Sequence, residues 1–83
     1  MNYKLDLTLA ASELVRSLKR SEGNRLVQFM EQLTEAPFVK GELSVSDATG
    51  REIQVSKVGS YLIYFWAEHL AETVHVTRIE KIH

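Results

Sequence analysis

The feature that most constrains the fold is the stretch Gly59–Ala67, in which residues 61–67 are all apolar or aromatic. A run of this length and composition predicts a β-strand that is apolar on both faces and lies in the middle of a sheet. Gly59 and Ser60 suit a two-residue hairpin loop, because glycine takes the positive φ that the first loop position needs. The rest of the chain must supply what covers each face.

Size and composition limit the classes of protein. The chain has 83 residues, a net charge of −1 and no cysteine, and we interpret residues 1–83 as one domain. Disulfides, thiolate metal ligands and a cysteine nucleophile are excluded, and no apolar run is long enough to span a membrane. The near-neutral charge gives no general attraction to nucleic acid or to an anionic membrane. The three histidines are dispersed, so we expect no metal site and no cofactor.

Periodicity and turn residues predict an α+β domain: an N-terminal strand, a helical hairpin, and a three- to four-stranded antiparallel meander that forms one sheet with two helices on one face. Residues 3–7 alternate as a strand does, and apolar residues then recur at helical spacing in two segments. Thr8 and Ser21 are the expected N-caps, and Pro37 ends the second helix near Ala36. Extended segments follow around residues 43–46, 53–56, 61–67 and 73–81, with a turn at 47–50. The place of the N-terminal strand in the sheet stays open.

The turns predict the strand registers, and the registers predict the two faces of the sheet. The two-residue loop pairs Val58 with Tyr61, and a three-residue loop at 48–50 pairs Leu43 with Val55. Pairing Ala67 with Thr73 then places the helices on the face that bears Val55, Tyr64 and Val76. The opposite face is predicted to expose an apolar strip for a partner protein, made of Tyr61, Ile63, Phe65 and Ile79.

Three segments resemble the RelE/ParE superfamily of bacterial type II toxins: Gly50–Val55, Gly59–Tyr64 and Val74–Lys81. The order of strand, helical hairpin and meander is also similar to that family. The resemblance implies a small growth-arresting toxin that a cognate antitoxin protein holds inactive. Some members of the family cleave messenger RNA on the ribosome, and others bind DNA gyrase.

The resemblance also implies site residues, although the match is incomplete. Ribosome-dependent nucleases of the family have lysines at the positions of Glu52 and Gln54, and an arginine at the position of Tyr61. The catalytic candidates that remain are Glu52 as a base, Tyr61 as a stacking ring or proton donor, Lys81 and His83. The alternative interpretation of His83 is that it belongs to a frayed terminus with no role in the chemistry. The nucleic-acid-binding candidates are Arg51, Lys57 and Arg78. Arg78 faces the helices unless a bulge after Val76 turns it round.

Two functions remain open. The first is a toxin of the ribosome-dependent mRNA endonuclease lineage, which the hairpin at Gly59–Tyr64 and the terminal His83 favour. The second is a non-catalytic binding protein, either a gyrase inhibitor or a toxin homologue that only binds its antitoxin, which the missing basic residues favour. In both cases we expect a cytoplasmic protein with no membrane partner, acting on the ribosome and mRNA or on DNA gyrase.

Overall fold

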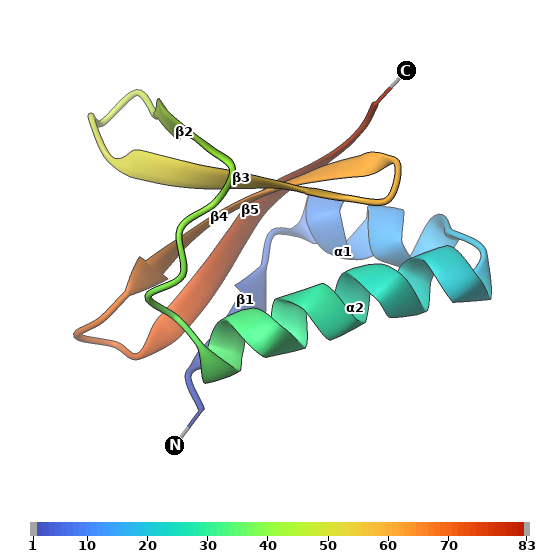
Figure 1. Cartoon of the computed structure of the whole chain (residues 1–83), viewed down its shortest axis with the longest axis horizontal. Helices are drawn as coiled ribbons and strands as arrows, with labels where there is room; N and C mark the ends of the chain where they lie inside the picture. The colour runs from blue at the N-terminus through green and yellow to red at the C-terminus, as the bar shows by residue number, and fades with distance from the viewer. Residues whose placement is uncertain (1, 83) are drawn as a thin grey trace.

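The apolar stretch forms β4 (Tyr61–Glu68), the middle strand of a five-stranded sheet in the computed structural model, which describes residues 2–82 (Figure 1). The remaining elements are β1 (Lys4–Leu7), α1 (Leu9–Ser17), α2 (Arg20–Glu35), β2 (Leu43–Ser46), β3 (Glu52–Val58) and β5 (Thr73–Lys81). The strand order is β1-β5-β4-β3-β2, and both helices pack on one face. The predicted α+β class is confirmed. The sheet is mixed, because β1 pairs parallel with β5 at its edge.

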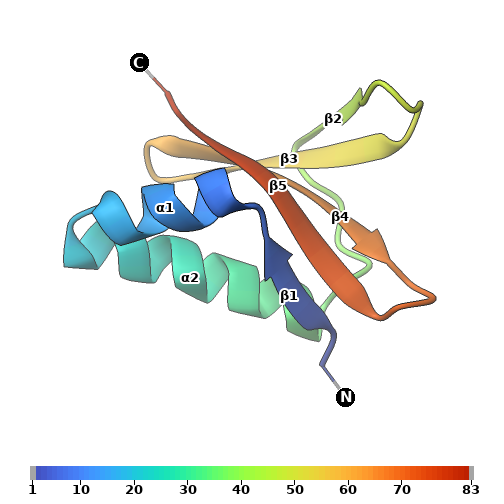
Figure 2. The same cartoon turned by 180° about the vertical axis from the view of Figure 1, so that it is seen from behind.

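The ends of the helices follow local chemistry, with one exception. The Thr8 hydroxyl accepts the Ala11 N–H at 3.2 Å, which confirms the predicted cap of α1. The predicted cap of α2 was wrong, since the helix begins at Arg20 and Lys19 occupies the N-cap without a side-chain hydrogen bond. α2 ends at Glu35, just before Pro37, as expected. Figure 2 shows the two helices lying together against the sheet.

The hairpin turns have the predicted geometry. Gly50 and Gly59 have φ values of 83° and 60°, the left-handed region that glycine adopts without a steric cost. Asp47 Oδ1 accepts hydrogen bonds from the N–H groups of Thr49 and Arg51 at 2.8 and 3.0 Å. The Thr49 hydroxyl, which also donates to this oxygen, is the main cause that lowers the pKa of Asp47 below its ordinary value. The predicted pairs Leu43–Val55 and Val58–Tyr61 are both present.

The predicted assignment of the faces of β4 was wrong. Its helix-facing side chains are Tyr61, Ile63 and Phe65, which are 5%, 0% and 3% exposed in the main core cluster. The predicted partner strip is therefore buried beneath the helices. Tyr64, expected in the core, lies half-buried on the opposite face. Because β4 is apolar on both faces, its alternation does not distinguish them, and packing against the helices decides.

The register of β5 on β4 also differs from the prediction, first at the loop and then at a bulge in β5. Glu68, and not Ala67, pairs with Thr73, and Val76 then pairs with Phe65. Tyr64 pairs with Arg78, so Thr77 is the extra residue. Val76 faces the helices as predicted, and Ile79 packs against the same core. Arg78 turns to the opposite face, as the bulge alternative predicted, and its guanidinium lies over the Tyr64 ring at 5.4 Å.

Within residues 2–82, none of the helices is both long enough and apolar enough to cross a membrane.

Candidate active site

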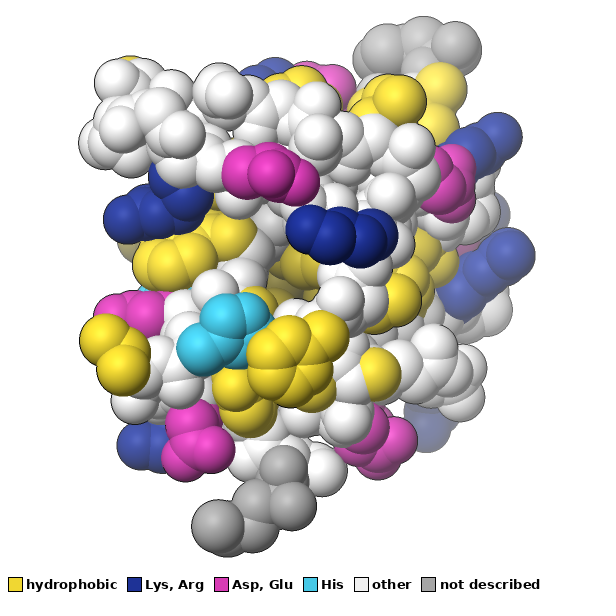
Figure 3. Space-filling view, turned by 60° about the vertical axis from the view of Figure 1, so that its left-hand side comes forward, with side chains coloured by type: hydrophobic (Ala, Val, Ile, Leu, Met, Phe, Trp, Pro, Cys, Tyr) yellow, Lys and Arg dark blue, Asp and Glu magenta, His cyan; other side chains and the backbone are white. Residues whose placement is uncertain are grey.

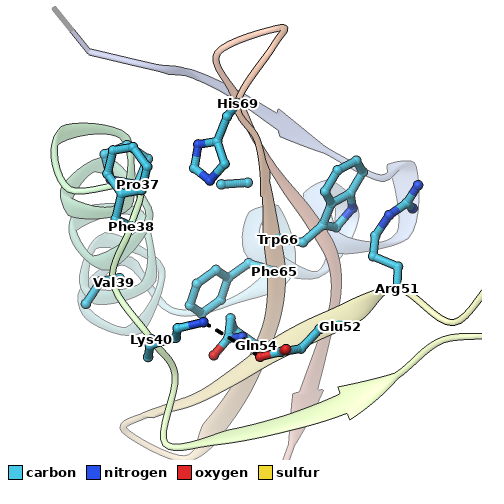
Figure 4. Close-up of a pocket in the computed structure, with 11 residues that line it drawn as sticks. Pro37, Phe38, Val39, Lys40, Arg51, Glu52, Gln54, Phe65, Trp66 and His69 are labelled. Carbon is cyan, nitrogen blue, oxygen red and sulfur yellow. Dashed lines mark hydrogen bonds and ion pairs between the residues drawn. The ribbon is translucent and has the colours of Figure 1, made fainter.

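An open cavity of about 440 Å³ lies where the segment after α2 passes the start of β3 and the end of β4. We refer to it as the Glu52 cavity. In Figure 3 a hollow separates histidine and hydrophobic side chains on one side from basic and acidic side chains on the other. The lining residues are Pro37, Phe38, Val39, Lys40, Arg51, Glu52, Gln54, Phe65, Trp66, Ala67 and His69 (Figure 4).

The apolar wall of the cavity is a fixed pair of rings. Phe38 stacks on His69 with the ring centroids 4.5 Å apart and the planes 11° apart, although Phe38 is 73% exposed. The Tyr3 ring meets both rings edge-on, and its hydroxyl lies 3.0 Å from His69 Nδ1. These contacts join the N-terminal segment, the α2–β2 segment and the β4–β5 loop. They hold the imidazole in one orientation while leaving the wall open to solvent.

The opposite wall is polar. Lys40 Nζ lies 3.9 Å from the Glu52 carboxylate, and Gln54 Nε2 donates to the same Glu52 oxygen at 2.7 Å. The Gln54 side-chain oxygen accepts the Gly41 N–H at 2.7 Å, which positions the amide. The side chains of Lys40 and Glu52 are mostly exposed, so their ion pair is weak and water or a ligand can compete for it. A carboxylate and an ammonium group are thus available in the cavity.

A row of stacked groups holds Arg51 at the end of the cavity. The Arg51 guanidinium lies 3.8 Å from the centre of the Trp66 ring, and His75 stacks on the same ring at 4.5 Å. His75 is in turn fixed by Asp6, 3.0 Å from Nδ1, and by Glu68, 2.9 Å from Nε2. Both ring nitrogens of His75 are therefore occupied by carboxylates. Its ring packs against Trp66, which in turn lies against the Arg51 guanidinium.

The predicted catalytic set is not assembled in one place. Glu52 begins β3, whereas Tyr61 pairs with Val58 at the other end of that strand. Six residues of extended chain separate the two ends by about 20 Å. Lys81 pairs with Tyr61 and lies at the far end as well, and Lys57 is exposed close by. The Tyr61 ring packs in the core, which is inconsistent with the predicted stacking on a nucleobase.

The other predicted residues are separate from the cavity. Arg78 lies on the open face of the sheet, where it forms an ion pair with Glu80. His83 lies outside the described residues. Of the predicted catalytic and nucleic-acid-binding residues that lie within residues 2–82, only Glu52 and Arg51 line the Glu52 cavity.

Sequence reasoning missed Lys40, Phe38 and His69, three cavity residues that lie in connecting segments. The available signal was their position in connecting segments, where binding and catalytic residues concentrate. Nothing local in the sequence indicates that residues 38–40 and residue 69 meet. Within residues 2–82, no group of three His, Asp or Glu side chains is arranged to hold a metal ion.

No family model matches the sequence, and no curated protein matches it. Solved structures match the fold. The archaeal RelE–RelB complex from Pyrococcus horikoshii OT3 has a TM-score of 0.79 at 12% identity, covering 98% of this chain and 96% of that one. The RelBE2 toxin–antitoxin complex from Mycobacterium tuberculosis has a TM-score of 0.78 at 17% identity, covering 98% and 99%. The isolated E. coli RelE toxin has a TM-score of 0.77 at 18% identity, covering 98% and 85%.

These matches define the class of fold, a small α+β domain that is similar over nearly its whole length to structures from archaea and bacteria. The particular fold is that of the RelE toxins, as the RelE/ParE resemblance of the sequence predicted.

Proposed function

We propose that this chain is the growth-arresting toxin of a type II toxin–antitoxin pair, and that it acts in the cytoplasm by cutting messenger RNA on the ribosome. The observation that carries the proposal is the Glu52 cavity, in which the Glu52 carboxylate lies 3.9 Å from Lys40 Nζ and which Arg51 also lines, on a fold shared with RelE toxins.

The groups in the cavity suit attack by the RNA 2′-hydroxyl on the adjoining phosphate. The reaction needs a base for that hydroxyl and cations for the charge that develops on the phosphorane. Glu52 is the base in this proposal, since its carboxylate is exposed and within reach of a ligand. Lys40 supplies positive charge next to Glu52, and Arg51, which also forms a 3.7 Å ion pair with Asp47, supplies a second cation at the edge of the cavity. The exposed ring of Phe38 offers a surface on which an unpaired nucleobase stacks.

Cations outside the cavity extend the proposed RNA-binding surface. Arg78 lies on the open face of the sheet, and Lys57 and Lys81 lie toward the other end of β3 and β5. In this proposal they contact phosphates away from the cleavage point, and each contributes to the salt dependence of binding. His83 and Tyr61 have no assigned step in the reaction.

The proposed antitoxin partner needs a surface other than the buried strip of β4. The edge strand β2 is exposed along its whole length, with Leu43 and Val45 65% and 46% exposed. An unpaired strand edge with protruding apolar side chains is suited to the addition of a strand from another chain. We therefore place the antitoxin contact on β2 and on the neighbouring Phe38. Two of the matched structures are toxin–antitoxin complexes, which supports a protein partner.

The test is expression from a tightly repressed promoter in a bacterium, with growth and mRNA cleavage measured after induction. Wild type should arrest growth and leave new mRNA ends within translated codons, detected by primer extension. Glu52→Gln should restore growth while the protein stays folded. Glu13→Gln, the same change on an exposed position of α1, is the matched control and should arrest growth as wild type does.

The dispersal of Tyr61 and Glu52 to opposite ends of the sheet favours the second candidate, a non-catalytic binding protein. Intact mRNA together with trapped gyrase–DNA complexes would identify a gyrase inhibitor. Full growth at high expression of folded protein would leave a homologue that binds its antitoxin alone.

A further inference from the structure

We propose that His69 is the general acid of this site, the group that protonates the leaving 5′-oxygen when the RNA strand is cut. This inference rests on the RNA-cleaving function proposed above and assigns it a residue that the sequence did not indicate. His69 lies in the β4–β5 loop and lines the Glu52 cavity from the wall opposite Glu52 (Figure 4).

The imidazole of His69 is fixed through one nitrogen. Its Nδ1 lies 3.0 Å from the Tyr3 hydroxyl, and its ring stacks on Phe38. No hydrogen bond joins Nε2 to another residue between 2 and 82, and Figure 4 shows the ring directed into the cavity. A histidine held at Nδ1 by a hydroxyl and open at Nε2 is arranged to transfer a proton at Nε2.

His75 cannot take this role in the present arrangement. Both of its nitrogens are bonded to carboxylates, Asp6 on one side and Glu68 on the other. It also does not line the Glu52 cavity. Among the histidines of residues 2–82, His69 is therefore the one that lines the cavity of Glu52, the proposed base, and has a ring nitrogen without a hydrogen bond to another described residue.

The positions of His69 and Glu52 suit the two ends of one displacement. Continuing the β3–β4 register beyond the Gln54–Phe65 pair places Glu52 opposite Ala67, two residues before His69. The two side chains line the Glu52 cavity, of about 440 Å³, from facing walls. In an in-line displacement the attacking and leaving oxygens are on opposite sides of the phosphorus, so a base and an acid on facing walls can each reach one of them.

Glu52 takes the proton of the 2′-hydroxyl, the 2′-oxygen bonds to phosphorus, and the bond from phosphorus to the 5′-oxygen breaks. The imidazolium of His69 gives its Nε2 proton to that 5′-oxygen. The products are a 2′,3′-cyclic phosphate and a 5′-hydroxyl, and proton exchange with water returns both side chains to their starting states. Lys40 and Arg51 offset the charge on the non-bridging oxygens.

The experiment measures single-turnover cleavage of a short mRNA in programmed ribosomes. His69→Phe keeps an aromatic ring against Phe38 but has no proton to donate, and His69→Gln is a second variant in case the first does not fold. Either variant should lower the cleavage rate by about 10²- to 10⁴-fold. It should also remove the alkaline limb of the pH–rate profile. Tyr3 is the ionisable group in contact with His69, and Lys40, Arg51 and Glu52 line the same cavity; Glu52 should retain its acidic limb.

A substrate with sulfur in place of the bridging 5′-oxygen separates an acid from a structural residue. A thiolate leaves without protonation, so His69→Phe should cut this substrate at close to the wild-type rate, whereas Glu52→Gln should remain slow. Tyr3→Phe removes the hydroxyl that holds His69 Nδ1 and should lower the rate on the ordinary substrate less than His69→Phe does.

Three results would overturn the assignment. If wild type cuts RNA and both His69 variants cut it equally fast, this inference falls and the proposed function stands. If the His69 variants are slow on both substrates, His69 is structural. If wild type cuts no RNA, the proposed function and this inference fall together.

Discussion

Replacing Gly41 by alanine should destabilise the fold strongly, because the β2 segment approaches β3 at this glycine. A Cβ atom on Gly41 would lie 2.6 Å from the carbonyl oxygen of Val55 and 2.7 Å from its nitrogen. Ordinary contact begins at 3.4 Å, so the overlap is about 0.8 Å. All the atoms it meets are backbone, and no side-chain rotation relieves the contact. The backbone segment that leads into β2 must therefore shift away from Val55.

The expected cost follows from that movement. Overpacking in a well-packed region costs about 1–3 kcal/mol. Displacing Gly41 also weakens its 2.7 Å hydrogen bond to Gln54, which is worth about 0.5–1.5 kcal/mol. We expect a loss of about 2–4 kcal/mol in the free energy of unfolding. In a domain of this size each 1 kcal/mol shifts the melting temperature by about 4–8 °C, so a fall of more than about 8 °C is expected.

Urea unfolding followed by circular dichroism and by the fluorescence of Trp66, the single tryptophan, measures the change. Gly23→Ala is the matched control. There the added Cβ lies 3.4 Å from its nearest neighbour in a helix, so the same substitution should stabilise the protein by up to about 1 kcal/mol. If Gly41→Ala proves as stable as wild type, Gly41 does not approach Val55 as closely as the structure shows. The position of the neighbouring segment that carries Lys40 would then be wrong as well.

Three further changes test the fold. Phe65→Asp places a charge beneath the helices, at a position 3% exposed, and should abolish the cooperative melting transition, whereas Leu43→Asp on the exposed edge strand should fold. Thr8→Ala removes the cap of α1 and should cost about 1 kcal/mol, while Ser21→Ala, which removes no cap, should change stability by less than about 0.5 kcal/mol. The pKa of Asp47 is lower in the folded than in the unfolded protein, so its ionised form stabilises the fold above the unfolded pKa of about 3.9. This stabilisation is lost as the pH falls through the pKa of Asp47 in the folded protein. The difference in unfolding free energy between wild type and Asp47→Ala should therefore be present at about pH 6 and shrink toward about pH 2.

The candidate site was predicted only in part. Glu52 and Arg51 came from a family resemblance along one strand, and both line the cavity. Lys40 and His69 were not found, because they come from separate connecting segments. Only the folded chain brings them to the same cavity. Tyr61 was predicted as a surface group because the wrong face of β4 was assigned to the helices, although its register against β3 was correct.

The sequence by itself determined the features that depend on neighbouring residues. The order of strands and helices, the hairpins at Gly50 and Gly59, and the cap at Thr8 all follow from backbone preferences and short-range hydrogen bonds. The tertiary structure alone decided which face of β4 meets the helices and where Thr77 bulges out of β5. It also decided that the segment after α2 and the β4–β5 loop meet across one cavity. The physical reason is that β4 is apolar on both faces, so its pattern has no preferred side until α1 and α2 pack against one of them.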